Sequence, residues 1–511
     1  MDDNAKNTPP KVDRETLIAC ANHGERGAGL LFAKLHQNKF LAEKVASRNG
    51  SKNLWYHFNG QFWEQDMLER VAQAISSMQN LFLDEIKRIQ SDREHYDKNA
   101  EAVVEVMEKA AFRLDRHSFL VNASLFAAEG DGSLGFIGDG FDQQKFKVPC
   151  ENGILDPAKC DIDENGRIVL ESKKAWRPMR PDDYVRHVCA PFNIEAECPE
   201  WEKFLTDALD GDTTEGREVI DFLQILAGYT LLGDPRQDVF VIKDSPNGRS
   251  GKGVFDKMLL RAFGTLGVTA KSSLFLKKSG NDPNKPEPAV MALKNKRLAV
   301  MSEQGKGEVY DAAEVKTKTS GRDAVSSRGL YGEEINFLPT YVFWQSTNDL
   351  PRISADDGAF WARVIRIKFP HHYVANPNPE DPTQKQIDTG LEARLEAEIS
   401  GILNWVIIGA IKYIQAGYQL PKYPKLVADA IAEYRQHEDN IADFIADCCI
   451  TGARYEVKSG ELYENFKNWC NETGRRISSQ KTFVDAMKRK GFTSERRKLG
   501  VYFIGLGIVQ R

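Results

Sequence analysis

The segment from residue 239 to residue 255 constrains the fold of this chain more than any other. It reads Val-Phe-Val-Ile-Lys-Asp-Ser-Pro-Asn-Gly-Arg-Ser-Gly-Lys-Gly-Val-Phe. An apolar run at 239–242 leads into a loop of small residues, and the loop delivers Gly251 and Lys252 to a helical pattern at 254–263. A strand, a glycine-containing loop and a helix in this order indicate a phosphate-binding loop, because backbone N–H groups and the positive end of the helix dipole hold anions.

The loop departs from the usual pattern at two positions. Pro246 stands in place of the first glycine, and Gly253 stands where Ser or Thr normally offers a hydroxyl to Mg²⁺. Lys252 is expected to reach the β- and γ-phosphates of a nucleotide. Taken alone, the segment also fits an ordinary glycine-rich turn. The expected nucleotide-binding residues are Pro246, Asn247, Gly248, Arg249, Ser250, Gly251, Lys252, Gly253 and Val254.

Two more apolar runs follow the loop, and each ends in polar residues. Residues 297–303 read as a buried parallel strand that ends at Glu303, which is predicted to polarise water or to hold the water shell of Mg²⁺. Residues 341–344 precede Asn348, which is predicted to orient water against the γ-phosphate. A solvated acid and a turn-forming asparagine are the alternatives. Three strands that end in order in a lysine loop, an acid and an amide favour catalysis.

A basic segment rich in hydroxyl groups, residues 316–331, lies between the second and third strands. It suits a loop that contacts phosphates of a nucleotide or of a nucleic acid backbone, and a solvated loop is the alternative. Of its two lysines, Lys318 is favoured as the DNA contact. The DNA-binding residues expected in this segment are Lys316, Lys318, Arg322 and Arg328.

Arg363 follows the third strand and is predicted to act as an arginine finger on the nucleotide of a neighbouring subunit. Arg366 and Arg352 are the alternative candidates for that role. The alternative for Arg363 is an ion pair with Asp356 or Asp357.

Five motifs in this order resemble the superfamily 3 helicases of the phage and plasmid primase–helicase group, which are related to the poxvirus replication NTPase. The resemblance implies an AAA+ ring ATPase that uses ATP and Mg²⁺, assembles as a homo-hexamer and translocates on single-stranded DNA. The matching residues are Ser250-Gly251-Lys252, Ser302-Glu303, Lys316 through Tyr331, Thr347-Asn348 with Leu350-Pro351, and Trp361 with Arg363-Val364 and Phe369-Pro370.

The expected fold class is α/β, with a P-loop ATPase core built on a parallel sheet. An α+β accessory domain is expected before this core, including a hairpin at Asn59-Gly60, and a C-terminal winged helix after it. A helix at about 216–232 is expected to form a collar that packs subunits together. The predicted divisions are a disordered tail at 1–15, the accessory domain at 16–210, the ATPase core with its collar at 211–380, a helical region at 381–445 and the winged helix at 446–511.

Composition narrows the class of protein. The 511 residues include 41% hydrophobic and 28% charged residues, an ordinary globular mixture. No apolar run reaches the roughly 18 residues of a membrane helix, so no contact with a membrane is expected. The expected location of the protein is the cytoplasm of a bacterial host cell. The eight cysteines form no Cys-x-x-Cys pair, which favours free thiols. Cys189 and Cys198 with His187 come nearest to a metal cluster.

Charge is distributed unevenly. Residues 451–511 carry thirteen Lys and Arg against six Asp and Glu, a net +7 in a chain of net −5. Such a basic module favours an anionic partner. Two helices, the second at 480–490, and a strand pair predict a winged helix that binds duplex DNA, with protein contacts alone as the alternative. Its expected DNA contacts are Lys481, Lys488, Arg489, Arg496, Arg497 and Lys498.

The leading hypothesis is an ATP-dependent replicative DNA helicase of a phage, plasmid or other mobile element, without a primase domain of its own. A primase and other replication proteins are expected partners. The alternatives are an ATP-dependent origin-binding initiator or loader that unwinds little, a small-molecule kinase, and a DNA-binding protein with a decayed loop. ATPase rates with and without single-stranded DNA separate most of these hypotheses.

Overall fold

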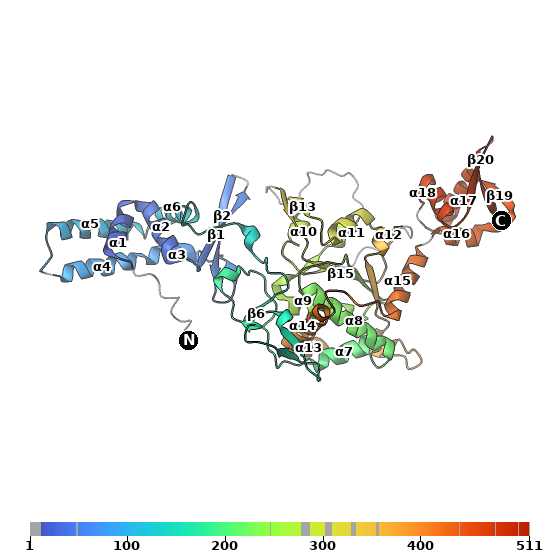
Figure 1. Ribbon diagram of the computed structural model, residues 1–511, viewed down its shortest axis with the longest axis horizontal. Coiled ribbons are helices and arrows are strands. Elements are labelled where there is room, and N and C mark those ends of the chain that lie inside the picture. Colours follow the sequence, from blue (N-terminus) through green and yellow to red (C-terminus); the bar gives the residue numbers. More distant parts are fainter. Residues whose placement is uncertain are drawn as a thin grey trace.

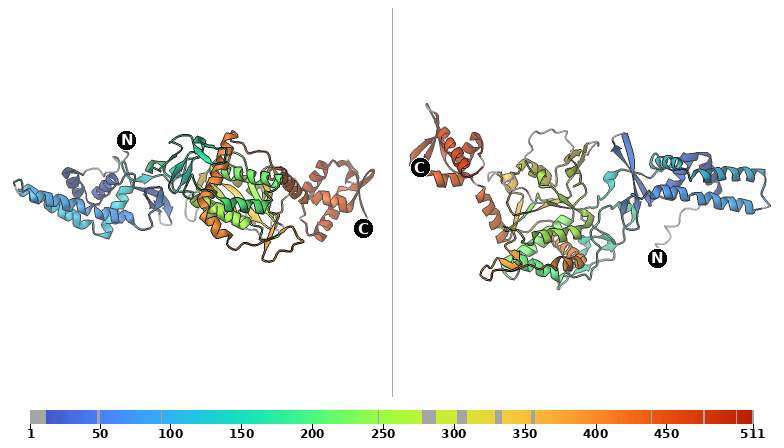
Figure 2. Two further views of the ribbon diagram at one scale, coloured as in Figure 1. Left: turned by 90° about the horizontal axis from the view of Figure 1, so that it is seen from below. Right: turned by 180° about the vertical axis from the view of Figure 1, so that it is seen from behind.

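The computed structural model describes residues 12–47, 50–92, 94–245, 247–276, 287–301, 309–328, 334–353, 357–438, 440–475, 477–498 and 500–509. The described elements form three units along the long axis of the molecule (Figure 1). A helical N-terminal unit lies at one end, an α/β body lies in the middle and a small C-terminal unit lies at the other end. Both further views show the same order (Figure 2).

The N-terminal unit combines helices with a small sheet. The sheet has the order β3-β2-β1-β4, and β2 and β3 form the antiparallel hairpin expected at Asn59-Gly60, where Gly60 adopts a φ of 98°. Helix α1 begins at Arg14, within the range expected to be a disordered tail, and residues 1–11 lie outside the described part. The elements are α1 (Arg14–Asn22), α2 (Gly24–Leu35), β1 (Phe40–Ser47), β2 (Gly50–Phe58), β3 (Trp63–Gln65), α3 (Arg70–Ser77), α4 (Gln79–Ser91), α5 (Lys98–Arg113), α6 (His117–Ala128) and β4 (Gly135–Phe136).

Short strands lead from this unit into the body. They are β5 (Val148–Cys150), β6 (Gly153–Leu155), β7 (Cys160–Ile162), β8 (Ile168–Leu170) and β9 (Trp176–Arg177). Their buried side chains belong to the same hydrophobic cluster as the body, which extends from Val148 to Val427, whereas the N-terminal unit has a separate cluster from Leu17 to Leu134. The hydrophobic cluster of the body therefore extends across residue 210, and the domain division expected there stays a prediction.

A five-stranded sheet forms the centre of the body, in the order β11-β12-β15-β10-β16. Every neighbouring pair is parallel, as expected for the three apolar runs. Such strands are nearly continuous runs of buried residues because helices cover both faces of a parallel sheet. The strands are β10 (Phe240–Asp244), β11 (Gly267–Ala270), β12 (Leu298–Met301), β15 (Val342–Thr347) and β16 (Val364–Lys368).

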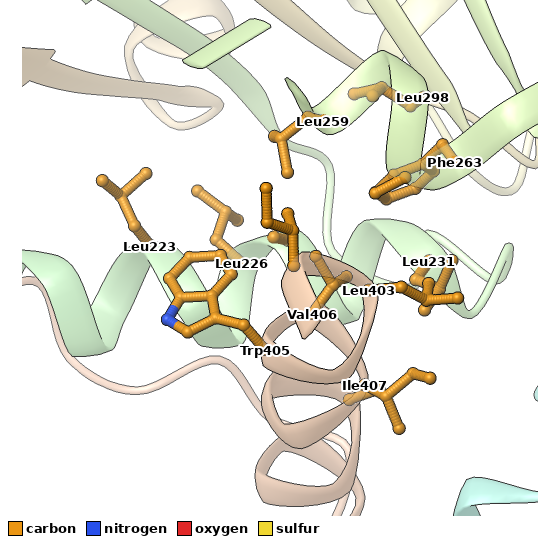
Figure 3. Close-up of a cluster of buried hydrophobic side chains, with 14 of the residues drawn as sticks. Leu223, Leu226, Leu231, Leu259, Phe263, Leu298, Leu403, Trp405, Val406 and Ile407 are labelled. Atoms are coloured by element: carbon orange, nitrogen blue, oxygen red, sulfur yellow. The ribbon is translucent and has the colours of Figure 1, made fainter. Parts of the chain in front are cut away.

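Helices α7 (Pro199–Leu209), α8 (Thr214–Leu231), α9 (Lys252–Phe263) and α14 (Ile399–Gln415) build the main core with this sheet. Figure 3 shows Leu223, Leu226 and Leu231 of α8 next to residues of α14, with Leu259 and Phe263 of α9 in the same cluster. Eleven of the 18 residues of α8 are buried. The expected collar helix is therefore present, but most of its surface packs inside its own chain.

Further elements lie around the sheet. They are α10 (Pro288–Met291), α11 (Ala312–Thr319), β13 (Val325–Arg328), β14 (Glu334–Phe337), α12 (Gly358–Trp361), β17 (His372–Val374), β18 (Gln384–Gln386), α13 (Leu391–Ala397) and α15 (Lys425–His437). The region expected to be helical at 381–445 thus begins with a short strand. Among the described residues no single helix is long and apolar enough to cross a membrane, although α13 and α14, bent by 71° at their break, meet the length and composition together.

The C-terminal unit has its own small core around Phe444, Phe466 and Phe503. Its elements follow in the order α16 (Asn440–Cys448), β19 (Cys449–Lys458), α17 (Ser459–Glu472), α18 (Gln480–Arg489), β20 (Thr493–Arg497) and β21 (Gly500–Ile508). The three strands form an antiparallel sheet in the order β19-β21-β20. The two helices and the strand pair expected from the sequence are confirmed.

Candidate functional site

The loop between β10 and α9 bends through two left-handed residues. Arg249 has a φ of 56° and Gly251 a φ of 90°, and α9 begins at Lys252 directly after them. A Cβ on Gly251 would lie 3.1 Å from the ring of Phe204, so both the backbone angle and the space favour glycine there. The loop therefore ends at the positive end of a twelve-residue helix, as a phosphate-binding loop requires. Pro246 lies outside the described residues.

Lys252 and Asn348 lie together although 96 residues separate them in the chain. The ammonium group of Lys252 donates a hydrogen bond to the Asn348 Oδ1 atom at 3.1 Å and to the Ser250 Oγ atom at 2.9 Å. The parallel pairing of β10 with β15 causes this proximity, because it places the carboxyl ends of both strands at one edge of the sheet. Asn348 is exposed at that edge, in the place where α/β sheets bind ligands.

Glu303, the expected catalytic acid and indirect Mg²⁺ ligand, lies outside the described residues. The strand before it is described as far as Met301, which pairs with Gln345 of β15. The carboxyl end of β12 therefore lies at the same sheet edge as Lys252 and Asn348. In the described ranges, no group of three or more His, Cys, Asp or Glu side chains could hold a metal ion. The region around Cys189 and Cys198 belongs to these ranges.

A buried polar cluster that the sequence analysis missed lies beneath the loop. Lys243 of β10 is 0% exposed and pairs with Asp256 of α9. Asp256 also accepts a hydrogen bond of 2.5 Å from the Ser346 hydroxyl of β15. Burial lowers the pKa of Lys243, and the Asp256 carboxylate opposes that shift. The sequence contains a signal for this cluster, namely a lysine inside an otherwise apolar strand. Lysines are almost never fully buried unless they are paired, so a buried carboxylate partner could have been expected.

The segment after β16 holds the loop from the outside. The backbone N–H of Tyr373 donates to the Arg249 carbonyl at 2.9 Å, and the imidazole of His372 contacts the Gly248 carbonyl. The adjacent His371 is 2.6 Å from a carboxylate oxygen of Asp210. Burial raises the pKa of Tyr373 to about 12, so its hydroxyl remains neutral near pH 7. These contacts fix the outer side of the loop to β17.

The two arginines near β16 occupy different places. Arg366 is buried and forms a two-point ion pair with Asp244, at 2.9 and 2.7 Å, so its guanidinium group already has a partner within the chain. Arg363 lies before the amino end of β16 and pairs with Asp238 at 2.5 Å. This is a different carboxylate from the two that the sequence suggested. The Arg363 Nε atom is buried and has no hydrogen-bond partner in the described part of the chain.

A cleft of about 830 Å³ opens at this amino end of the sheet. Arg322 lines it together with Arg363, Arg236 and Lys422. The carboxyl end of β10, where Lys252 lies, is about 16 Å away, the length of a five-residue strand. Arg363 therefore lies at the opposite end of the sheet from the loop of its own chain. Arg352 is exposed and donates to the Gly474 carbonyl of the C-terminal unit at 2.9 Å.

The four basic residues expected to contact DNA in the segment 316–331 differ in exposure and in surroundings. The expected loop is helical as far as Thr319. Lys318 on α11 is 5% exposed and pairs with Glu314, whereas Lys316 on the same helix is exposed. The sequence favoured Lys318 as the DNA contact, but the difference in exposure favours Lys316 for that role. Arg322 lines the cleft at the amino end of the sheet, and Arg328 is exposed at the end of β13.

The expected DNA contacts of the C-terminal unit are exposed wherever their side chains are described. Lys481 and Lys488 lie on α18, and Arg496, Arg497 and Lys498 lie at and beside the end of β20. Arg497 also pairs with Glu456 of β19 at 2.9 Å. The side chain of Arg489 lies outside the described part. Helix α18 and the tip of the β20–β21 pair therefore carry exposed positive charge.

Two known families match parts of this chain. The family described as "D5 N terminal like" matches residues 30–210, and the family described as "Poxvirus D5 protein-like" matches residues 436–503. The two matches lie before and after the strands of the parallel sheet in the sequence. These matches confirm the resemblance to the poxvirus D5-like primase–helicase group.

Its relatives are viral proteins that are provisionally named helicases or primases. A helicase so named from Acanthamoeba polyphaga mimivirus is 23% identical over 464 residues, which cover 86% of this chain and 45% of that protein. A helicase so named from Invertebrate iridescent virus 3 is 23% identical and covers 48% of this chain and 28% of that protein. A primase so named from African swine fever virus is 21% identical and covers 56% and 30%. The chain spans less than half the length of these curated relatives.

Among solved structures, the apo form of the C terminal region of NrS-1 aligns with a TM-score of 0.37 and 13% identity. The alignment covers 69% of this chain and 84% of that chain.

Proposed function

We propose that this chain is an ATP-dependent replicative DNA helicase of superfamily 3, which serves a virus, plasmid or other mobile element. The single observation that carries the proposal is the contact between Lys252 and Asn348 at the carboxyl edge of a parallel sheet. A lysine loop and an amide on a neighbouring strand are two of the groups that ATP hydrolysis needs, one to neutralise phosphate charge and one to orient water. The D5-type matches and the names of the relatives agree with this class.

The described residues fit a nucleoside triphosphate. The loop presents backbone N–H groups through two left-handed residues, and α9 adds its positive end. Lys252 would neutralise the β- and γ-phosphates, and Asn348 would orient the attacking water. Mg²⁺ would supply charge neutralisation at the phosphates when bound. Position 253 has no hydroxyl, so we assign the water shell of the metal to Glu303.

The working form that we propose is a homo-hexameric ring in which Arg363 acts on the nucleotide of the next subunit. Support comes from its place, since Arg363 lies about one strand length from Lys252 of its own chain. Its buried Nε atom also has capacity for another hydrogen bond. Arg322 lines the same cleft as Arg363. We therefore no longer propose Arg322 as a DNA contact and group it with Arg363 at the amino end of the sheet. Arg366 is unsuited to the role because Asp244 holds it.

We propose two separate contacts with DNA. Exposed Lys316 would hold the backbone of a single strand, without sequence preference. The C-terminal unit would bind duplex DNA as a winged helix, through α18 and the tip of the β20–β21 pair. Its support is the order of helices and strands together with the exposed Lys481 and Lys488.

The test is the ATPase rate of the full chain with and without single-stranded DNA. Lys252→Ala should weaken nucleotide binding and turnover together, whereas Glu303→Gln should bind ATP and hardly hydrolyse it, because only the water-polarising carboxylate is lost. Mixed rings of inactive Arg363→Ala and inactive Glu303→Gln subunits should recover part of the hydrolysis. Turnover like that of the unaltered chain in both the Lys252 and the Glu303 variants would refute the assignment.

An origin-binding initiator or loader is the second candidate, favoured by the exposed basic residues of the C-terminal unit. Strand displacement on a forked substrate separates the two. An ATPase that binds duplex DNA tightly but displaces no strand would be the loader.

A further inference from the structure

Two polar contacts, one above the other, join the loop helix α9 to the strand β15. The upper contact is the hydrogen bond from Lys252 to Asn348. The lower contact runs from Asp256, one helical turn after Lys252, to the Ser346 hydroxyl, two residues before Asn348. Both ends of the lower contact therefore lie close in sequence to the two groups that would touch the γ-phosphate.

The Asp256 side of the lower contact is also fixed by a buried lysine. Asp256 also pairs with Lys243, which lies opposite Ser346 in the register of β10 and β15. The Lys243 ammonium group lies 5.0 Å from the ring centroid of Phe255 and 5.3 Å from that of Trp344. A lysine enclosed by two aromatic rings and one carboxylate has little freedom to move. If it left the carboxylate, its charge would be unpaired in an apolar environment, which is energetically costly. Asp256 is accordingly fixed relative to both strands.

We propose that the Asp256 carboxylate, held by Lys243 and bonded to Ser346, is a positioning group that sets the place of Asn348 opposite Lys252. The inference rests on the proposed function, in which Asn348 orients the attacking water. Asp256 is buried and bonded to Lys243 and Ser346, so we assign it no contact with the nucleotide. It acts through the end of β15, where Ser346 is the point of attachment.

The decisive variant is Ser346→Ala in the full chain, because it removes the hydroxyl and leaves the Lys243–Asp256 ion pair in place. We expect kcat for DNA-stimulated ATP hydrolysis to fall between about tenfold and a hundredfold, the cost of a small misplacement in an active site. KM for ATP and the affinity for a fluorescent ATP analogue should change by less than about twofold, since Lys252 and the loop backbone remain. Ser346→Thr keeps a hydroxyl and should recover most of the rate.

Two controls separate positioning from a general loss of stability. Ser459→Ala removes a hydroxyl from the C-terminal unit, outside the α/β body, and should leave kcat unchanged. The melting temperature of each variant reports folding directly. A Ser346→Ala protein that melts earlier but retains full kcat while folded would show a structural role only and would overturn the inference.

Epistasis with Asn348 gives the sharpest result. If Ser346 acts through Asn348, then Ser346→Ala should have no further effect on kcat in an Asn348→Ala background, because the group to be positioned is already absent. Equal and multiplicative losses in both backgrounds would overturn the inference. If Asn348→Ala alone retained full ATPase activity, the proposed function itself would fail, so the two failures are distinguishable.

Discussion

The buried ion pair between Arg366 and Asp244 gives a quantitative prediction about the core beneath the loop. The two side chains are 7% and 8% exposed, and the pair ties β16 to the last residue of β10. Arg366 also donates to the Ala430 carbonyl of α15 at 2.8 Å. Arg366→Ala would remove these bonds and leave the Asp244 carboxylate buried without a counter-charge. Breaking a buried pair in this way costs about 3–5 kcal/mol.

The assay is urea unfolding of the body, followed by tryptophan fluorescence, since Trp201 and Trp344 are fully buried in its core. Arg366→Ala and Asp244→Ala should each lower the free energy of unfolding by about 3–5 kcal/mol. The double variant Arg366→Met with Asp244→Leu should be much less destabilised than either, because no uncompensated charge remains. A comparison of transition midpoints suffices, since a chain of three units need not unfold in one step.

The result also tests the role of Arg366 in catalysis. A trans-acting finger can be removed without loss of stability, because it contributes to a neighbour's site and not to its own core. If Arg366→Ala unfolded like the unaltered chain and lost only its ATPase activity, the reasoning would be wrong and Arg366 would replace Arg363 as the finger.

Three further predictions concern the loop and the basic residues. Gly253→Ser should retain ATP binding in isothermal titration calorimetry, because no atom of the described residues lies within 4 Å of a Cβ at that position. Gly251→Ala should lose ATP binding, since its φ of +90° and the nearby Phe204 ring both oppose a side chain. Equal binding by both variants would contradict this. Lys316→Ala should reduce the salt dependence of single-strand binding by about one unit in slope, whereas Lys318→Ala should mainly lower the melting temperature; the reverse pattern would restore Lys318 as the DNA contact. Lys481→Ala with Lys488→Ala should weaken duplex binding at low salt in fluorescence anisotropy and leave basal ATPase intact, and unchanged affinity would reassign the C-terminal unit to protein contacts.

Local patterns in the sequence were sufficient to place the strands and the lysine loop. The apolar runs at 239–242, 297–301 and 341–344 became neighbouring parallel strands, since buried strands are short, apolar and bounded by polar residues. The hairpin at Asn59-Gly60 and the helices of the C-terminal unit followed from turn chemistry and helical periodicity in the same way. Boundaries between units were less predictable, because the strands at 148–177 join the core of the body only through contacts that are distant in sequence.

The sequence by itself determined which residues could hold phosphate, because glycines, a lysine and the start of a helix are local features. Only the tertiary structure decided which charges are available. It buried Lys318 beside Glu314 and enclosed Arg366 with Asp244, and it left Lys316 exposed. It also placed Arg322 in the same cleft as Arg363 and assembled the cluster of Lys243, Asp256 and Ser346 from three elements. The physical reason is that burial and ion pairing depend on neighbours across the fold, which neither residue type nor spacing along the chain specifies.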